Sequence, residues 1–161
     1  MVKKEEIEAV LYEIKDPEIP TLSIVDLGII TKIDVDHKPI YVQLTPTFAG
    51  CPALKVIEDS VMEALVGNFP SEKFKVETSF ETQWTTDRLT PKGKQSLLDH
   101  GLAPPEDGEN RIELDVLSDV ACPQCNSRNT DLKSPFGATL CRTIHYCNNC
   151  LESFEAFKPV V

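Results

Sequence analysis

The sequence has no long hydrophobic run and no apolar leader. No stretch of its 161 residues approaches the roughly 20 consecutive apolar residues that a membrane-spanning helix needs. The first residues, Met1–Glu6, lack the apolar core of a signal peptide, so we expect a cytoplasmic protein. In that compartment cysteines are more often metal ligands or reactive thiols than disulfides. The six cysteines are therefore the first candidates for functional residues.

Basic residues are also scarce. Sixteen Lys and Arg stand against 26 Asp and Glu, which gives a net charge of −10. The imbalance is uneven, because residues 1–119 carry 12 basic and 23 acidic side chains, whereas residues 120–161 carry four and three. Most of the chain would repel nucleic acid and anionic lipid, so we expect neither as a partner.

Two catalytic signatures are missing as well. The seven glycines form no Gly-rich nucleotide-binding loop. No segment carries the paired Glu-x-x-His motifs of a di-iron helix bundle. The sequence therefore predicts neither a nucleotide-dependent enzyme nor a di-iron oxygenase, and it assigns no catalytic residue.

Helical and strand patterns alternate over the first hundred residues or so. Apolar spacing and capping residues predict helices at about residues 7–14, 52–69 and 90–100. Alternating apolar residues predict strands at about residues 28–35, 40–45 and 74–80. This pattern indicates an α+β domain in which helices cover one face of a small mixed sheet. We place that domain at residues 1–103, a Pro- and acid-rich linker at 104–118 with a possible strand at 111–117, and a zinc ribbon at 119–161.

The ribbon is predicted from two C-x-x-C knuckles with 21 residues between them. The four cysteines are Cys122, Cys125, Cys147 and Cys150. This spacing lets four sulfurs reach one tetrahedral ion at about 2.3 Å, with no open position, so we expect a structural zinc. Thiolates also accept iron, so a rubredoxin-like iron site stays an alternative, as does a redox-active cysteine pair. A module this small has too little core to fold without its metal.

Cys141 is left over from the knuckles. On a continuous strand it would share a face with Cys147 and with His145. We expect it to be a small core residue, with a spare metal ligand as the alternative.

The last cysteine, Cys51, lies in the stretch Thr45–Leu54 between a predicted strand and a predicted helix. Gly50 permits a tight turn, and Pro52 suits the first helical position, so Cys51 falls next to a helix N-terminus. Unpaired N–H groups and the helix dipole favour a thiolate there, which would be a nucleophile or a soft metal ligand. The alternative is an inert, half-buried apolar residue.

Five motifs carry a resemblance to a known family. They are Asp16–Pro20, Ile24–Ile29, Thr45–Pro52, Trp84–Gly93 and Phe136–Arg142. The first three resemble the SufT-like family of metal–sulfur cluster biosynthesis proteins. With the last two and the ribbon, nearly the whole chain is similar to the PaaD-like family of accessory components of the bacterial phenylacetyl-CoA epoxidase. Arg88 departs from the pattern, because aromatic residues are common there in relatives.

The resemblance implies an accessory protein that matures iron or iron–sulfur centres of the oxygenase or of its reductase in phenylacetate degradation. It implies these oxygenase and reductase subunits as partners and leaves a homodimer open. Cys51 would bind the transient iron or cluster, and Asp26 is the nearest acidic residue to assist it, although Asp26 could equally stabilise the hairpin.

Three other functions compete with this interpretation. The chain could be a structural docking subunit of the epoxidase, with Cys51 inert. It could be an enzyme with Cys51 as its nucleophile, but no histidine lies near Cys51 in the sequence to act as its base. A nucleic-acid-binding ribbon is the third, and the acidic composition argues against it.

Overall fold

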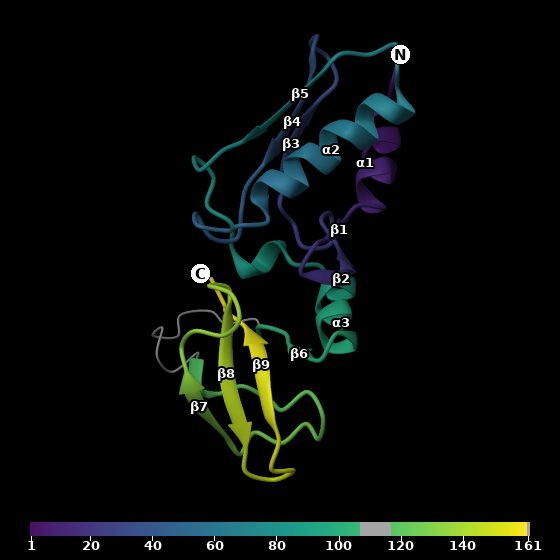
Figure 1. The fold of residues 1–161 in the computed structure, drawn as a ribbon. Helices are drawn as coiled ribbons and strands as arrows, with labels where there is room; N and C mark the ends of the chain where they lie inside the picture. Colours follow the sequence, from purple (N-terminus) through teal and green to yellow (C-terminus); the bar gives the residue numbers. More distant parts are fainter. Residues whose placement is uncertain (107–116, 161) are drawn as a thin grey trace. The chain divides into compact units, whose positions relative to one another are not determined.

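The computed structural model describes residues 1–106 and 117–160. The chain divides into two compact units, Met1–Trp84 and Thr85–Val161, which we describe separately. Figure 1 shows the elements of each unit. Within the described residues, no helix has the length and apolar character needed to cross a membrane.

The first unit is a mixed three-stranded sheet with two helices and a small hairpin. Its elements are α1 (Lys4–Tyr12), β1 (Lys15–Asp16), β2 (Ile19–Ser23), β3 (Ile30–Asp34), β4 (Ile40–Leu44), α2 (Leu54–Asn68) and β5 (Phe74–Thr78). The strand order is β3-β4-β5, with β3 antiparallel and β5 parallel to β4. The predicted α+β fold with a small mixed sheet is confirmed.

Both helices lie on the same side of this sheet, as Figure 1 shows. Alternate β4 residues are buried, namely Ile40, Val42 and Leu44. Helix α2 buries Ile57, Val61 and Leu65, and α1 buries Ile7 and Leu11. Side chains alternate between the two faces of a strand, and they recur on one face of a helix every three to four residues. These apolar residues therefore lie in one layer between the sheet and the helices.

The hairpin β1–β2 was not predicted from the sequence. Its turn is fixed by Asp16, whose Oδ1 accepts hydrogen bonds from the N–H groups of Glu18 (2.8 Å) and Ile19 (3.0 Å). Asp16 therefore stabilises the hairpin turn and not the end of α1, which already ends at Tyr12. A carboxylate before proline commonly accepts bonds from the N–H groups that follow it, which favours a turn over a helix end.

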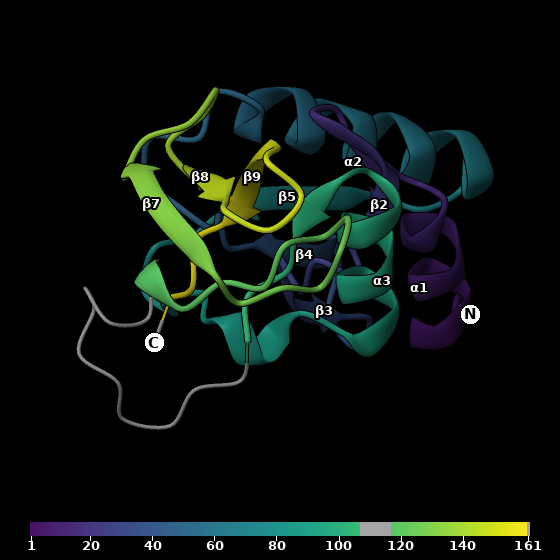
Figure 2. The same cartoon turned by 90° about the horizontal axis from the view of Figure 1, so that it is seen from below.

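The second unit contains the ribbon and the segment that precedes it. Its elements are η1 (Thr86–Arg88), α3 (Pro91–Asp99), β6 (Leu102–Ala103), β7 (Thr130–Ser134), β8 (Arg142–Cys147) and β9 (Ser153–Phe157). The strand order is β6-β9-β8-β7, and Figures 1 and 2 show β8 between β7 and β9. The cap of α3 is as predicted, since Oγ1 of Thr90 accepts a bond from the N–H of Gly93 at 3.0 Å.

The structure differs from the predicted domain boundary at residue 103. Strand β6 pairs in parallel with β9, with Leu102 opposite Glu155 and Ala103 opposite Ala156. The side chains of Leu102 and Ala103 are buried, so residues 85–103 belong to the same compact unit as the ribbon. The predicted strand at 111–117 falls almost wholly outside the described residues.

Candidate metal centre and thiol loop

The four knuckle cysteines meet at one point of the second unit. Their sulfur atoms all lie within 4.8 Å of one another. Sγ of Cys122 is 3.7 Å from Sγ of Cys150, and Sγ of Cys125 is 3.5 Å from Sγ of Cys147. In a zinc–thiolate tetrahedron with bonds of about 2.3 Å, two sulfurs are about 3.8 Å apart. The donor set and its spacing therefore fit a four-coordinate zinc.

The two knuckles have the same backbone structure. In each, the first cysteine carbonyl accepts a bond from the N–H four residues later, at 2.9 Å from Asn126 to Cys122 and from Leu151 to Cys147. Asn126 and Leu151 both adopt a left-handed backbone, with φ of 60° and 64°. Asparagine tolerates this conformation, whereas leucine has no side-chain polar group to offset it.

The cysteine thiols differ in electrostatic environment. A hydrogen bond from Nδ2 of Asn149 to Sγ of Cys125 (3.6 Å) lowers the pKa of Cys125 to about 6. Burial raises the pKa of the Cys150 thiol to about 12. A bound metal requires all four groups as thiolates, so Cys150 releases a proton on binding near neutral pH.

Cys141, the candidate spare ligand, and His145, which shares its strand face, lie outside this cluster. Cys141 is half-buried just before β8, with its Sγ 3.0 Å from Oγ1 of Thr139. His145 is buried, its Nε2 lies 2.8 Å from Oγ1 of Thr143, and its ring stacks on Phe154 at 5.3 Å between centroids. Within the described residues, the group that could hold a metal ion consists of the four knuckle cysteines.

In the first unit, three segments leave the sheet at one end. Ile30 pairs with Leu44 across β3 and β4, and the N–H of Thr45 donates to the carbonyl of Ile29 at 2.8 Å. Strand β5 runs parallel to β4, and the N–H of Ser79 donates to the carbonyl of Leu44 at 2.8 Å. The turn before β3, the loop after β4 and the segment after β5 are therefore neighbours.

Cys51 lies on the loop after β4. The sequence placed Pro52 at the first helical position, but α2 begins at Leu54, with Ala53 as its N-cap. The N–H of Cys51 donates to the carbonyl of Phe48 (3.1 Å), and the Cys51 carbonyl accepts from Leu54 (3.3 Å), so a turn joins the cysteine to the helix. Cys51 is half-buried.

The N-terminus of α2 carries no compensating negative charge of its own. Ala53 makes no side-chain capping bond, and the first turn of α2 contains no acidic residue. The positive end of the helix dipole thus lies one turn from Cys51, which favours an anionic ligand there.

Asp26 lies in the turn before β3, at the same end of the sheet, and is only 7% exposed. Trp84 fixes this turn, since its Nε1 donates to the carbonyl of Leu27 at 2.9 Å and its side chain is buried. Gly28 has φ of 77°, a backbone that glycine adopts at no steric cost. The sequence motif had singled out Trp84 without a role, and the structure shows it as a support of the Asp26 turn.

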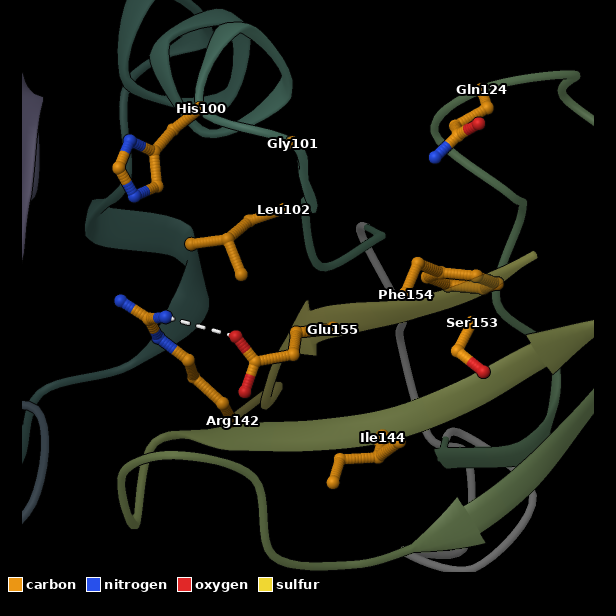
Figure 3. Close-up of a pocket in the computed structure, with 9 residues that line it drawn as sticks. All are labelled: His100, Gly101, Leu102, Gln124, Arg142, Ile144, Ser153, Phe154 and Glu155. Atoms are coloured by element: carbon orange, nitrogen blue, oxygen red, sulfur yellow. Dashed lines mark hydrogen bonds and ion pairs between the residues drawn. The ribbon is translucent and has the colours of Figure 1, made fainter.

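A hollow of about 340 Å³ in the second unit was not predicted at all. Figure 3 shows Arg142 from β8 and Glu155 from β9 pointing toward each other within it. Nη1 of Arg142 lies 3.0 Å from Oε2 of Glu155, and both groups are largely shielded from solvent. His100 is exposed and lines the same hollow. The ion pair connects the two central strands of the ribbon.

Comparisons with known proteins match both units. Residues 4–77 match the family described as iron–sulfur cluster assembly protein, and residues 107–158 match the PaaD zinc beta ribbon domain. The crystal structure of a DUF59 domain of unknown function from Bacillus anthracis superposes with a TM-score of 0.53 at 25% identity, covering 58% of this chain and 90% of that one. The conserved hypothetical protein TM0487 from Thermotoga maritima superposes with a TM-score of 0.51 at 28% identity, covering 60% of this chain and 94% of that one.

Two curated relatives extend the match. "Fe-S protein maturation auxiliary factor YitW" of Bacillus subtilis (strain 168) is 30% identical over 95 residues, 58% of this chain and 92% of the relative. A putative 1,2-phenylacetyl-CoA epoxidase component of Escherichia coli (strain K12), named as one of the subunits of that enzyme, is 36% identical over 155 residues, 96% of this chain and 92% of the relative.

The fold, the four-cysteine cluster and the two family matches together define a protein with an iron–sulfur assembly domain followed by a zinc ribbon. The similarity to the Escherichia coli relative extends over nearly the whole of both chains. The chain belongs to the PaaD family of phenylacetyl-CoA epoxidase components.

Proposed function

We propose that this protein is a cytoplasmic accessory factor that matures iron or iron–sulfur centres of a phenylacetyl-CoA epoxidase, in its oxygenase or its reductase. The relatives named as an Fe–S maturation factor and as an epoxidase component support this function. The protein serves the epoxidase in phenylacetate degradation without catalysing the epoxidation itself.

The observation that carries the proposal is the position of Cys51. Its thiol is half-buried one turn before α2, at a helix N-terminus without an acidic residue in its first turn. A thiolate there is a soft ligand for an iron ion or a cluster, which are the cargo. Asp26, in the neighbouring turn, would supply a further anionic group beside the cargo or hold the loop in place.

The four-cysteine cluster has a different task in this proposal. Zinc bound by Cys122, Cys125, Cys147 and Cys150 has no open coordination position, so it would stabilise the ribbon and take no part in transfer. The two metal functions of the chain are therefore assigned to separate units.

The experiment is a Cys51→Ser exchange in cells that depend on the epoxidase. Serine keeps the size of the side chain but is a poor ligand for iron and clusters. We expect folded oxygenase and reductase with lowered iron and sulfide content, and slower growth on phenylacetate alone. Cys141→Ser is the matched control, because Cys141 is also a half-buried thiol outside the zinc cluster. Full iron occupancy in Cys51→Ser cells under iron limitation would refute the role of Cys51.

A second function, a docking subunit with Cys51 inert, is favoured by the name of the Escherichia coli relative. It predicts that Cys51→Ser leaves metal content unchanged, whereas loss of the protein abolishes assembly of the complex. The same cells therefore distinguish the two functions.

A further inference from the structure

The four cysteines of the metal cluster differ in their exposure to solvent. Cys122 is 1% exposed and Cys147 is 0% exposed. Cys150 is half-buried, whereas Cys125 is exposed. The residues on either side of Cys125 are exposed as well, so it lies in the middle of an exposed turn. A molecule in solution therefore meets the cluster first at Cys125.

The other three ligands are covered by the apolar packing of the ribbon. Cys122 and Cys147 belong to a buried apolar cluster that also contains Phe154, and Cys150 packs against this cluster. Of the four ligands that the structure describes, Cys125 lies outside this packing. Because the reactivity of a cysteine depends on access to its sulfur, the four ligands should differ in how fast they react.

Two neighbours define the surroundings of the exposed sulfur. Nδ2 of Asn149, from the second knuckle, donates to Sγ of Cys125 at 3.6 Å. Sγ of Cys147 lies 3.5 Å from the same sulfur. An N–H···S bond withdraws electron density from a thiolate, so Asn149 should restrain the nucleophilicity of Cys125 without covering it.

We propose that Cys125 is a modification site, namely the thiolate at which soft electrophiles and peroxides attack the zinc cluster and release its metal, with Asn149 as the residue that restrains it. The proposal rests on the zinc assignment made under the proposed function. A zinc ion with four sulfur ligands has no open coordination position, so a reagent cannot bind the metal first. A coordinated thiolate keeps lone pairs that can attack, and the exposed thiolate is the one that a reagent reaches.

The reaction with a peroxide is a two-electron oxidation. The sulfur of Cys125 attacks one peroxide oxygen, so that an S–O bond forms, the O–O bond breaks and hydroxide leaves. The neighbouring thiolate of Cys147 then attacks the sulfenic sulfur, so that an S–S bond forms, the S–O bond breaks and a second hydroxide leaves. Two sulfurs are oxidised and the peroxide is reduced. Zinc thereby loses two of its four ligands and is released.

The first test follows the zinc-loaded full chain during reaction with limiting iodoacetamide, which forms one C–S bond and expels iodide. Tandem mass spectrometry locates each modified cysteine, and a chromophoric chelator reports zinc release. We expect Cys125 to be modified roughly tenfold faster than Cys122 or Cys147, with zinc released at the same rate. Modification of Cys122, Cys147 or Cys150 before Cys125 would overturn the proposal. With hydrogen peroxide, the first disulfide should join Cys125 to Cys147, and a first disulfide that lacks Cys125 would also overturn it.

Two ligand exchanges form a matched pair of variants. Cys125→His and Cys150→His each give a Cys₃His set, which also holds structural zinc. Cys125→His removes the exposed thiolate, so zinc release by either reagent should slow about fivefold or more. Cys150→His keeps that thiolate, so zinc release should stay within about twofold of wild type. Equal rates in the two variants would contradict the proposal. If neither variant holds zinc, the order of modification in the wild-type chain still decides.

A second pair of variants tests the role of Asn149. Asn149→Ala removes the N–H···S bond, so Cys125 should react about two- to threefold faster. Asn148→Ala is the matched control, because Asn148 is the adjacent exposed asparagine and its Nδ2 donates instead to Oδ1 of Asn129 at 3.3 Å. This variant should react at the wild-type rate. An unchanged or slower reaction of Asn149→Ala would overturn the role given to Asn149.

The zinc assignment and the modification site fail separately. Protein that holds no zinc after reconstitution would overturn both. Zinc-loaded protein that is modified first at another ligand would overturn the modification site and leave the zinc assignment standing. Neither result bears on the maturation role of Cys51, which is tested by the iron content of the epoxidase subunits.

Discussion

Leu151→Gly should stabilise the second unit, because Leu151 occupies a left-handed backbone conformation with φ of 64°. An L-residue in this region costs roughly 1–2 kcal/mol. Glycine removes that cost but adds roughly 0.5–1 kcal/mol of backbone entropy in the unfolded chain. The side chain is 67% exposed, so its removal sacrifices little burial. The net expectation is a gain of about 0.7 kcal/mol in the free energy of unfolding.

Asn126→Gly is the matched control, because Asn126 holds the same position in the first knuckle with φ of 60°. Asparagine tolerates this backbone, so little strain is relieved and the entropy cost should leave this variant slightly destabilised, by about 0.5 kcal/mol. Urea unfolding of the zinc-loaded proteins measures both values. A Leu151→Gly variant no more stable than Asn126→Gly would refute the strain argument. Leu151→Asn should be more stable than Leu151→Gly, because asparagine tolerates this backbone without the entropy cost of glycine.

Further predictions concern the zinc cluster and the first unit. Purified protein should carry about one zinc per chain, and Cys122→Ser should abolish it and unfold the second unit while residues 1–84 stay folded. Zinc affinity should rise with pH, since the metal competes with protons for the thiolates. Burial raises the pKa of Cys150 to about 12, so calorimetry near neutral pH should detect proton release on zinc binding. Trp84→Phe should cost about 1 kcal/mol or more in unfolding free energy, because it leaves the Leu27 carbonyl without the indole donor; an unchanged midpoint would contradict this.

The elements that were predictable depend on short-range signals. The C-x-x-C spacing alone brings two sulfurs together, so the cluster of Cys122, Cys125, Cys147 and Cys150 was predictable. Thr90 followed by Pro91 indicated the start of α3 because capping is a property of adjacent residues. The mixed sheet followed from the alternation of helix and strand patterns along the first unit.

The elements that were missed depend on contacts between distant residues. Strand β6 is only two residues long, and it is a strand because β9 offers a free edge far along the chain. Nothing local distinguishes Leu102–Ala103 from the end of a linker. Likewise, the start of α2 at Leu54 is set by the turn that Cys51 forms with Phe48 and Leu54, which a proline at position 52 does not reveal. The Arg142–Glu155 pair arises from the strand pairing of β8 with β9 and had no signal of its own.

The second knuckle and the loop of residues 135–141 lie at opposite ends of the same pair of strands. Strand β8 runs from Arg142, beside the loop, to the candidate metal ligand Cys147, and β9 returns from Ser153 to Phe157 and the adjacent Lys158. The knuckle is thus the turn of the β8–β9 hairpin, and Glu155, which fixes the loop, belongs to that hairpin.

Zinc should therefore control the order of the loop of residues 135–141 through this hairpin. Removing zinc with a chelator should release the knuckle, weaken the pairing of β8 with β9 and disorder this loop, since a unit of this size depends on its metal. The N–H groups of Gly137 and Ala138 are bonded to the Arg142 carbonyl and to Oε1 of Glu155, so we expect chelation to speed their hydrogen exchange and zinc to restore their protection, while the amides of residues 1–84 keep theirs. Unchanged protection of Gly137 and Ala138 after complete zinc removal would show that the loop does not depend on the metal.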